Sequence, residues 1–198
     1  MSLPPLAICT PGRQSVDFNW VMEIAHQPRA VLVIGTIGAG KTVVAIEMGE
    51  ILEESGIRSA ILDLDWLGWV HRGPGQHVAV DDLIASNLGA IVPNFGAVGI
   101  HHYVLARSIR SVEQVAGLKD AFDGASLVVA RLTASKETIS NRLRNRDEGE
   151  VLKEHLVQAE HFAAEQAQAD LADFDISNES GSVREVATEI LLRLGWIG

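Results

Sequence analysis

Apolar residues along the chain fall into five short continuous runs, and between these runs they recur every three or four positions. A continuous apolar run is typical of a strand covered on both faces, whereas the longer spacing is typical of a helix with one buried face. The runs cover residues 30–35, 59–65, 101–109, 126–134 and 172–177. Strands that alternate with helices predict an α/β fold of three α/β/α layers, in which helices cover both faces of a five-stranded parallel sheet.

Residues that begin or end helices support this division. Helices are predicted over residues 41–54, 80–94, 111–124, 135–147 and 151–170, and from residue 182 onward. The pairs Ser111/Gln114 and Ser182/Glu185 have the spacing of a capping box, in which each side chain accepts a hydrogen bond from the other residue's backbone N–H. Pro93 is expected near the end of its helix.

The first 29 residues are less regular and are interpreted as an N-terminal extension. Within them, residues 17–26 have the pattern of a short helix, which the pair Gln27-Pro28 would end. Residues 30–198 contain no internal repeat and no linker, so we expect them to form a single domain.

One loop carries a specific chemical signal. The segment from Gly35 to Thr42 reads GTIGAGKT and has the spacing of a P-loop, between an apolar strand and a helix. Its glycines allow the tight turn that points successive N–H groups at a phosphate. Lys41 is expected to contact the β- and γ-phosphates, and Thr42 to bind Mg²⁺. The expected nucleotide-binding residues are Gly35, Thr36, Ile37, Gly38, Ala39, Gly40, Lys41, Thr42 and Val43. The alternative is a glycine-rich turn that binds no ligand.

Two carboxylates follow the second predicted strand. Because Asp63 and Asp65 are two residues apart, strand alternation would place both on the same face, at the carboxyl edge of the sheet where ligands bind. Phosphoryl transfer to a hydroxyl needs a group that orients the acceptor and takes its proton. Asp65 is our candidate for that role, and Asp63 could hold a Mg²⁺-bound water. Alternatively, both only accept backbone hydrogen bonds.

The phosphate loop and the Asp-x-Asp pair together resemble the small P-loop kinases, which include shikimate, gluconate and adenylylsulfate kinases. The segment LDLDW is similar to the adenylylsulfate-kinase segment around its paired aspartates. The resemblance covers residues 30–196, mostly as architecture. It implies the P-loop NTPase fold with a sheet ordered 2-3-1-4-5, and a mobile helical lid between the fourth and fifth strands. It also implies that adenine lies between the lid helix and residues 178–181.

The segment that resembles the lid, about residues 135–150, is rich in arginine. Arg142 and Arg146 are four residues apart and so share one helix face. Lid arginines stabilise charge on the transferring phosphoryl group, and a closed lid excludes water. Both arginines are therefore candidate catalytic residues, with Arg142 favoured because Arg146 is nearer to an acidic turn. The alternative is that both pair with Asp147, Glu148 and Glu150 on an exposed helix.

Other residues are candidates for binding the phosphate acceptor. Trp66 and Trp69 follow Asp65 directly and could stack on a sugar or a base, or could equally cover the sheet. Arg107 and Arg110, after the third strand, could bind an anionic acceptor. Pairing of these arginines with helix carboxylates is as plausible.

Several absent motifs narrow the class of nucleotide-binding protein. The third strand ends without the acidic residue that many P-loop ATPases use, which disfavours a motor or transport ATPase. The Asn-Lys-x-Asp motif of guanine-specific proteins is missing, so ATP is expected rather than GTP. The glycine triplet with which shikimate kinases bind their acid substrate is also missing. The resemblance therefore supports the reaction type and leaves the acceptor open.

Composition and charge narrow the partners further. The 198 residues include 16 Lys and Arg against 26 Asp and Glu, a net charge of −10, which argues against nucleic acid as a partner. The single cysteine excludes an internal disulfide. No apolar run approaches the roughly 20 residues of a membrane span, and no secretory signal is recognised, so we expect a cytoplasmic protein.

These features together predict an ATP- and Mg²⁺-dependent phosphotransferase, a kinase that phosphorylates a hydroxyl or similar group of a small molecule. One alternative is a nucleoside monophosphate kinase, which Arg107, Arg110 and the tryptophans would suit. Another is a nucleotide-binding switch that hydrolyses ATP slowly and acts through a partner.

Overall fold

The computed structural model describes residues 27–198 except 72, 74, 76 and 123–125, so the extension up to residue 26 and its expected helix lie outside the described residues. Five parallel strands form one sheet in the order β2-β3-β1-β4-β5, which confirms the predicted topology. The strands are β1 (Arg29–Ile34), β2 (Ser59–Asp63), β3 (His102–Ala106), β4 (Ser126–Thr133) and β5 (Phe174–Ser177). The central strand β1 is buried along nearly its whole length, as its apolar run predicts.

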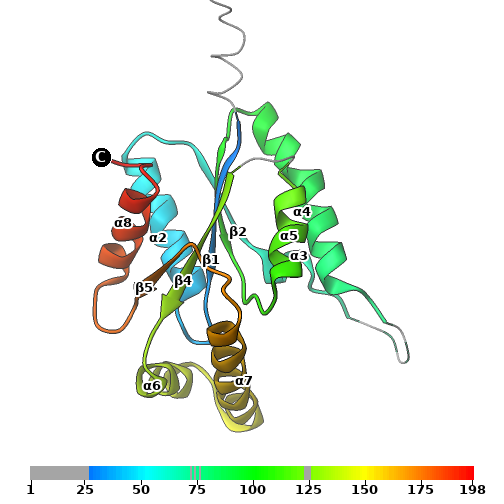
Figure 1. Ribbon diagram of the computed structural model, residues 1–198, viewed down its shortest axis with the longest axis vertical. Coiled ribbons are helices and arrows are strands. Elements are labelled where there is room, and N and C mark those ends of the chain that lie inside the picture. The colour runs from blue at the N-terminus through cyan, green and yellow to red at the C-terminus, as the bar shows by residue number, and fades with distance from the viewer. Residues whose placement is uncertain (1–26, 72, 74, 76, 123–125) are drawn as a thin grey trace, which may run out of the picture.

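Helices cover both faces of the sheet, which gives the three predicted layers (Figure 1). One face packs on α2 (Lys41–Glu54) and α8 (Val183–Arg193), and the other packs on α3 (Leu64–Leu67), α4 (Val80–Ala97) and α5 (Val112–Asp120). Both predicted capping boxes are present, at Ser111 and at Ser182. Apolar side chains from alternate strand positions fill the two resulting cores, so the sheet is a rigid base for the loops at its edge.

Several predicted boundaries are wrong. The second strand ends at Asp63, because this side chain caps the short helix α3 by accepting a hydrogen bond from the backbone N–H of Asp65. Asp65 is therefore helical, and strand alternation is not what orients the two carboxylates. The helix α4 continues through Pro93 to Ala97, since Phe95 packs edge-on against Tyr103 in the core and stabilises the extra turn. The third strand is shorter than expected and leaves the sheet at Arg107.

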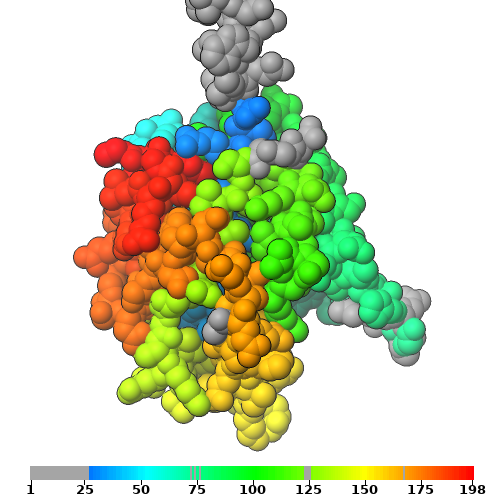
Figure 2. Space-filling view, in the orientation of Figure 1, coloured from blue at the N-terminus to red at the C-terminus, as the bar shows by residue number. Residues whose placement is uncertain are grey.

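Two further helices lie beyond the carboxyl ends of the strands. They are α6 (Lys136–Arg146) and α7 (Gly149–Gln168), which connect β4 to β5 and form the lower part of the molecule in Figures 1 and 2. Ile37 of the phosphate loop packs between them, in a small apolar cluster with Ile139 and Leu143 of α6 and Ala159 of α7. Within the described part of the chain, no helix has the length and apolar character needed to cross a membrane.

Candidate active site

The phosphate loop has the backbone that the glycine spacing predicts. Gly38 and Gly40 have φ angles of 84° and 95°, a region that residues with a side chain rarely adopt. A Cβ atom on Gly40 would lie 2.7 Å from Nδ2 of Asn178, and one on Gly38 would lie 3.2 Å from Leu143. Both the conformation and the close packing therefore require glycine at these two positions. The loop ends at Lys41, the first residue of α2, so the helix N-terminus faces the loop.

The ammonium group of Lys41 lies inside the loop and donates a hydrogen bond of 3.0 Å to the backbone oxygen of Thr36. Burial lowers the pKa of Lys41 to about 8, although Asp65 and Asp63 act in the opposite direction. A charged amine in such a low-dielectric site binds an anion strongly, because the anion replaces the stabilisation that the amine loses when burial removes it from water. A phosphate bound in the loop would therefore raise the pKa of Lys41 and fix its charge.

Thr42 and Asp63 form a pair suited to a divalent cation. The hydroxyl of Thr42 donates a hydrogen bond of 2.7 Å to Oδ2 of Asp63, so a hydroxyl and a carboxylate from α2 and β2 meet beside the loop. Such hard oxygen ligands are the ones Mg²⁺ takes, together with waters and substrate phosphates. The residues present therefore fit the metal that the sequence predicts at Thr42 and Asp63.

Asp65 lies beside this pair, since its backbone N–H donates a hydrogen bond to Asp63, and its Oδ1 lies 3.7 Å from Nε of a buried arginine, Arg107. Partial burial and the neighbouring Asp63 carboxylate raise the pKa of Asp65, while Arg107 and Lys41 oppose the shift. Arg107 also forms an ion pair with Asp81 in the first turn of α4, and Asp81 accepts a 3.0 Å hydrogen bond from Gln114 of α5. A continuous polar network thus links the predicted base to two helices on one face of the sheet.

A cavity of about 240 Å³ opens on one side of the phosphate loop. We call it the Lys41 cavity. Its walls are Gly38, Gly40, Lys41, Thr42, Val43, Arg142, Leu143 and Arg146. The two arginines predicted to act as lid residues therefore both face the loop, from the same side of α6. A cavity with one lysine, two arginines and backbone N–H groups is suited to a polyphosphate.

The two arginines have different partners in this structure. Arg142 donates a hydrogen bond of 2.8 Å to the backbone oxygen of Asn178, and its second nitrogen lies 3.5 Å from the backbone oxygen of Ala39. Arg146 forms two hydrogen bonds of 2.9 Å with Asp147, which also pairs with His155. The alternative that the sequence allows for both arginines, pairing with the acidic turn after α6, is therefore found for Arg146. Arg142 forms hydrogen bonds only with backbone atoms among the described residues.

Two residues of the loop after β5 support the site. They belong to the segment 178–181 that the resemblance places next to adenine, but no local pattern in the sequence indicated this supporting role. Asn178 is buried and donates a 2.7 Å hydrogen bond to the backbone oxygen of Ala39, within the phosphate loop. Glu179 accepts three hydrogen bonds of 2.6 Å from the start of α6, two from Ser135 and one from Thr138. These bonds lower the pKa of Glu179 to about 2. The loop after β5 therefore fixes both the phosphate loop and α6.

A second cavity, of about 420 Å³, borders the phosphate loop at Ile37, and we call it the Arg107 cavity. Its lining is Ile37, Asp65, Val80, Asp81, Arg107, Ser108, Arg110, Gln114, Gln158 and Phe162. Arg110 lies 4.3 Å above the ring of Phe162, and its Nε lies 3.9 Å from Glu165 of α7. Both predicted acceptor arginines thus line one cavity, and both pair with helix carboxylates.

Trp66 and Trp69 lie apart from this cavity lining. Their rings stack on each other with centroids 5.0 Å apart, and the residues are 69% and 63% exposed. They do not cover the sheet, and their predicted stacking on an acceptor stays a prediction. The structure therefore brings together the phosphate loop, Asp63, Asp65, both arginines of α6 and both arginines after β3.

Known structures share this architecture at low sequence identity. A sugar kinase from Janibacter sp. HTCC2649 has a TM-score of 0.57 at 18% identity, over 85% of this chain and 95% of that one. The APS kinase of Mycobacterium tuberculosis, solved with AMPPNP and APS, has a TM-score of 0.55 at 20% identity, over 85% of this chain and 98% of that one. A shikimate kinase from Acinetobacter baumannii, solved with shikimate, has a TM-score of 0.53 at 17% identity, over 87% of this chain and 97% of that one.

No protein-family model matches the sequence, and a search of curated proteins finds no match. The similarity therefore rests on the arrangement of the backbone. The sheet order, the phosphate loop and the matching structures define the fold of the small P-loop kinases. The expected fold class is thereby confirmed.

Proposed function

We propose that the protein is an ATP- and Mg²⁺-dependent kinase that transfers the terminal phosphoryl group of ATP to a hydroxyl of a small molecule. The observation that carries this proposal is a pair of cavities that both border one phosphate loop, the Lys41 cavity and the Arg107 cavity. A phosphotransferase needs two such sites, because donor and acceptor must be bound at the same time with their reacting atoms close together.

In this proposal, the Lys41 cavity binds the triphosphate. Lys41 and the backbone N–H groups of the loop contact the phosphates, and Arg142 or Arg146 stabilises charge on the transferring group. Thr42, with Asp63 acting through water, would hold Mg²⁺, which would neutralise charge on the β- and γ-phosphates. For Arg146 to reach a phosphate, it must exchange its bonds to Asp147 for bonds to the nucleotide.

The acceptor would occupy the Arg107 cavity, with its hydroxyl against Asp65. The Asp65 carboxylate orients this hydroxyl toward the γ-phosphate and takes its proton as the new P–O bond forms and ADP leaves. The raised pKa of Asp65 suits this role, because a carboxylate of raised pKa is a stronger base. The fold of the sugar kinase, APS kinase and shikimate kinase supports the same reaction type.

The experiment that tests the proposal measures ADP release from ATP and Mg²⁺, alone and with a panel of hydroxylated metabolites and nucleosides. Stimulation by an acceptor, together with a phosphorylated product in the mass spectrum, supports a kinase. Tight ATP binding with slow, acceptor-independent ADP release would contradict it and favour the nucleotide-dependent switch.

A further inference from the structure

The charges that line the Arg107 cavity balance one another. Two arginines, Arg107 and Arg110, face two aspartates, Asp65 and Asp81, and all four belong to the lining. Glu165, 3.9 Å from Arg110, adds a further carboxylate next to the cavity. Neither guanidinium is thus without a carboxylate nearby, and the cavity has no excess of positive charge. An anionic group entering it would have to compete with protein carboxylates for both arginines.

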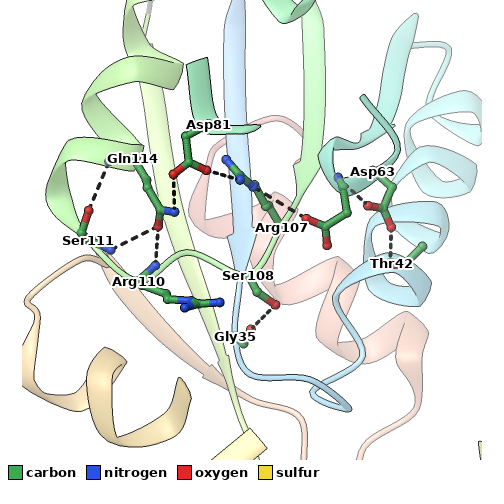
Figure 3. A network of polar contacts seen from close by, with 10 residues as sticks. Gly35, Thr42, Asp63, Asp81, Arg107, Ser108, Arg110, Ser111 and Gln114 are labelled. Carbon is green, nitrogen blue, oxygen red and sulfur yellow. Dashed lines mark hydrogen bonds and ion pairs between the residues drawn. The ribbon is translucent and has the colours of Figure 1, made fainter. Parts of the chain in front are cut away.

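The positive charge of Arg107 is neutralised by nearby carboxylates. Arg107 is 6% exposed, and its guanidinium forms an ion pair with Asp81 (Figure 3). Its Nε atom lies 3.7 Å from Oδ1 of Asp65. Although partial burial acts in the opposite direction, hydrogen bonds from Gln114 and Arg107 lower the pKa of Asp81. Asp81 therefore stays ionised at neutral pH and continues to neutralise Arg107.

One donor in the network has no hydrogen-bond partner. The Nε atom of Arg107 is buried and bonds to no acceptor within the described residues, since Oδ1 of Asp65 is 3.7 Å away. A buried N–H without an acceptor costs free energy, which a ligand can recover. Because Nε is itself buried, a ligand reaches it only if the side chains around it move. A hydroxyl oxygen would then satisfy both groups at once, because it accepts a hydrogen bond from Nε and donates one to the Asp65 carboxylate. A carboxylate or phosphate oxygen can only accept, and it would be repelled by Asp65.

The remaining polar lining is neutral, and part of the lining is apolar. Ser108, Gln114 and Gln158 offer a hydroxyl and two amides, which both donate and accept hydrogen bonds. Ile37 and Val80 contribute apolar atoms to the lining, as does Phe162, whose ring has Arg110 over one face. This combination fits a ring-shaped compound with several hydroxyls and an apolar face, as in a sugar or a cyclitol.

We infer that the acceptor is an uncharged polyhydroxy ring compound, and that Asp81 excludes anionic acceptors by neutralising Arg107. This inference rests on the proposed function, because it names the substrate class of the site assigned to the acceptor. It favours the uncharged class over the anionic acceptor considered for Arg107 and Arg110 in the sequence.

The test uses three probes that share one ring and differ in charge: glucose, glucosamine and glucuronate. Each is titrated into the ¹⁵N-labelled full chain loaded with AMPPNP and Mg²⁺, to about 100 mM, which detects even millimolar affinities. The readout is the Nε–H resonance of Arg107, assigned by its absence from Arg107→Lys. We expect glucose to shift this resonance at lower concentration than either charged probe. Tighter binding of glucuronate or glucosamine, or no shift with glucose, would overturn the inference.

A matched pair of variants tests the role of Asp81. Asp81→Asn should raise the affinity for glucuronate relative to glucose by about two- to fivefold, the effect of removing one partly exposed carboxylate from a guanidinium. Asp82→Asn, the control, makes the same change at the next residue, which is exposed and outside the cavity lining. An unchanged ratio in Asp81→Asn would refute the exclusion mechanism. These measurements need no turnover, so the kinase proposal is tested separately by ADP release.

Discussion

The substitution Asp65→Asn should abolish most of the catalytic activity while leaving the stability of the fold unchanged. The change keeps the size of the side chain but removes its charge and its ability to take a proton. We expect kcat for phosphoryl transfer to fall by about 10²–10⁴, the usual contribution of a positioned base, which raises the activation free energy by roughly 3–5 kcal/mol. The affinity for ATP should stay within about twofold, since Asp65 lines the Arg107 cavity and is not part of the lining of the Lys41 cavity.

The structure also predicts the effect of this change on stability. The Asp65 side chain is 59% exposed, and Arg107 keeps its ion pair with Asp81 when Asp65 loses its charge. Since the pKa of Asp65 is raised in the folded protein, its ionised form is disfavoured there, and neutralising it does not weaken the fold. The free energy of unfolding should therefore change by no more than about 0.5 kcal/mol.

Three measurements check this prediction. A coupled ADP assay gives kcat with the acceptor found in the initial panel, calorimetry with AMPPNP gives the nucleotide affinity, and urea unfolding gives stability. Asp82→Asn is the control for a change in net charge. If Asp65→Asn retains more than about a tenth of kcat, Asp65 is not the base. If the free energy of unfolding falls by several kcal/mol, the stability argument is wrong.

Three further predictions concern the phosphate loop and its supports. Lys41→Met should weaken ATP binding by at least about tenfold, because the only lysine in the Lys41 cavity is lost, and calorimetry measures this. Gly40→Ala should destabilise the protein by about 1–3 kcal/mol more than Gly56→Ala in urea unfolding. Both glycines have positive φ, but only at Gly40 would the new Cβ meet Asn178. Glu179→Gln should be less stable than wild type at neutral pH. The bonds that lower the pKa of Glu179 stabilise the fold fully at a pH above the pKa of this carboxyl in the unfolded chain, and this contribution is lost as the carboxylate is protonated. The difference in unfolding free energy between wild type and Glu179→Gln should therefore vanish as pH falls from about 5 to about 2, which unfolding measured across that range checks.

Features that depend on neighbouring residues could be predicted from the sequence. The phosphate loop requires a fixed spacing of glycines, and the capping boxes at Ser111 and Ser182 involve residues three positions apart. Strand order followed from the family resemblance and was correct. The end of β2 was misplaced because Asp63 acts as a helix cap. The hydrophobic pattern does not reveal this cap, since the apolar residues continue after Asp63 with Leu64.

Contacts between distant residues could not be predicted in the same way. Asn178 bonds to Ala39, 139 positions away, and Glu179 bonds to Ser135, 44 positions away. No local pattern specifies such pairs, since they exist only once the sheet brings the strand ends together. The same holds for Arg107, whose partner could be foreseen as a helix carboxylate but not as Asp81 in particular.

The hydrogen bond from Asn178 to Ala39 has a consequence for the order of events during synthesis. The ribosome makes Ala39 first, but its partner Asn178 emerges only after β5, 139 residues later. A nascent chain that contains the phosphate loop and four strands therefore still lacks the side chain that fixes the loop. β5 supplies an edge of the sheet, and the loop after it fixes the phosphate loop. If the protein binds ATP as we propose, the nucleotide therefore stabilises the fold only after β5 and this loop have been synthesised.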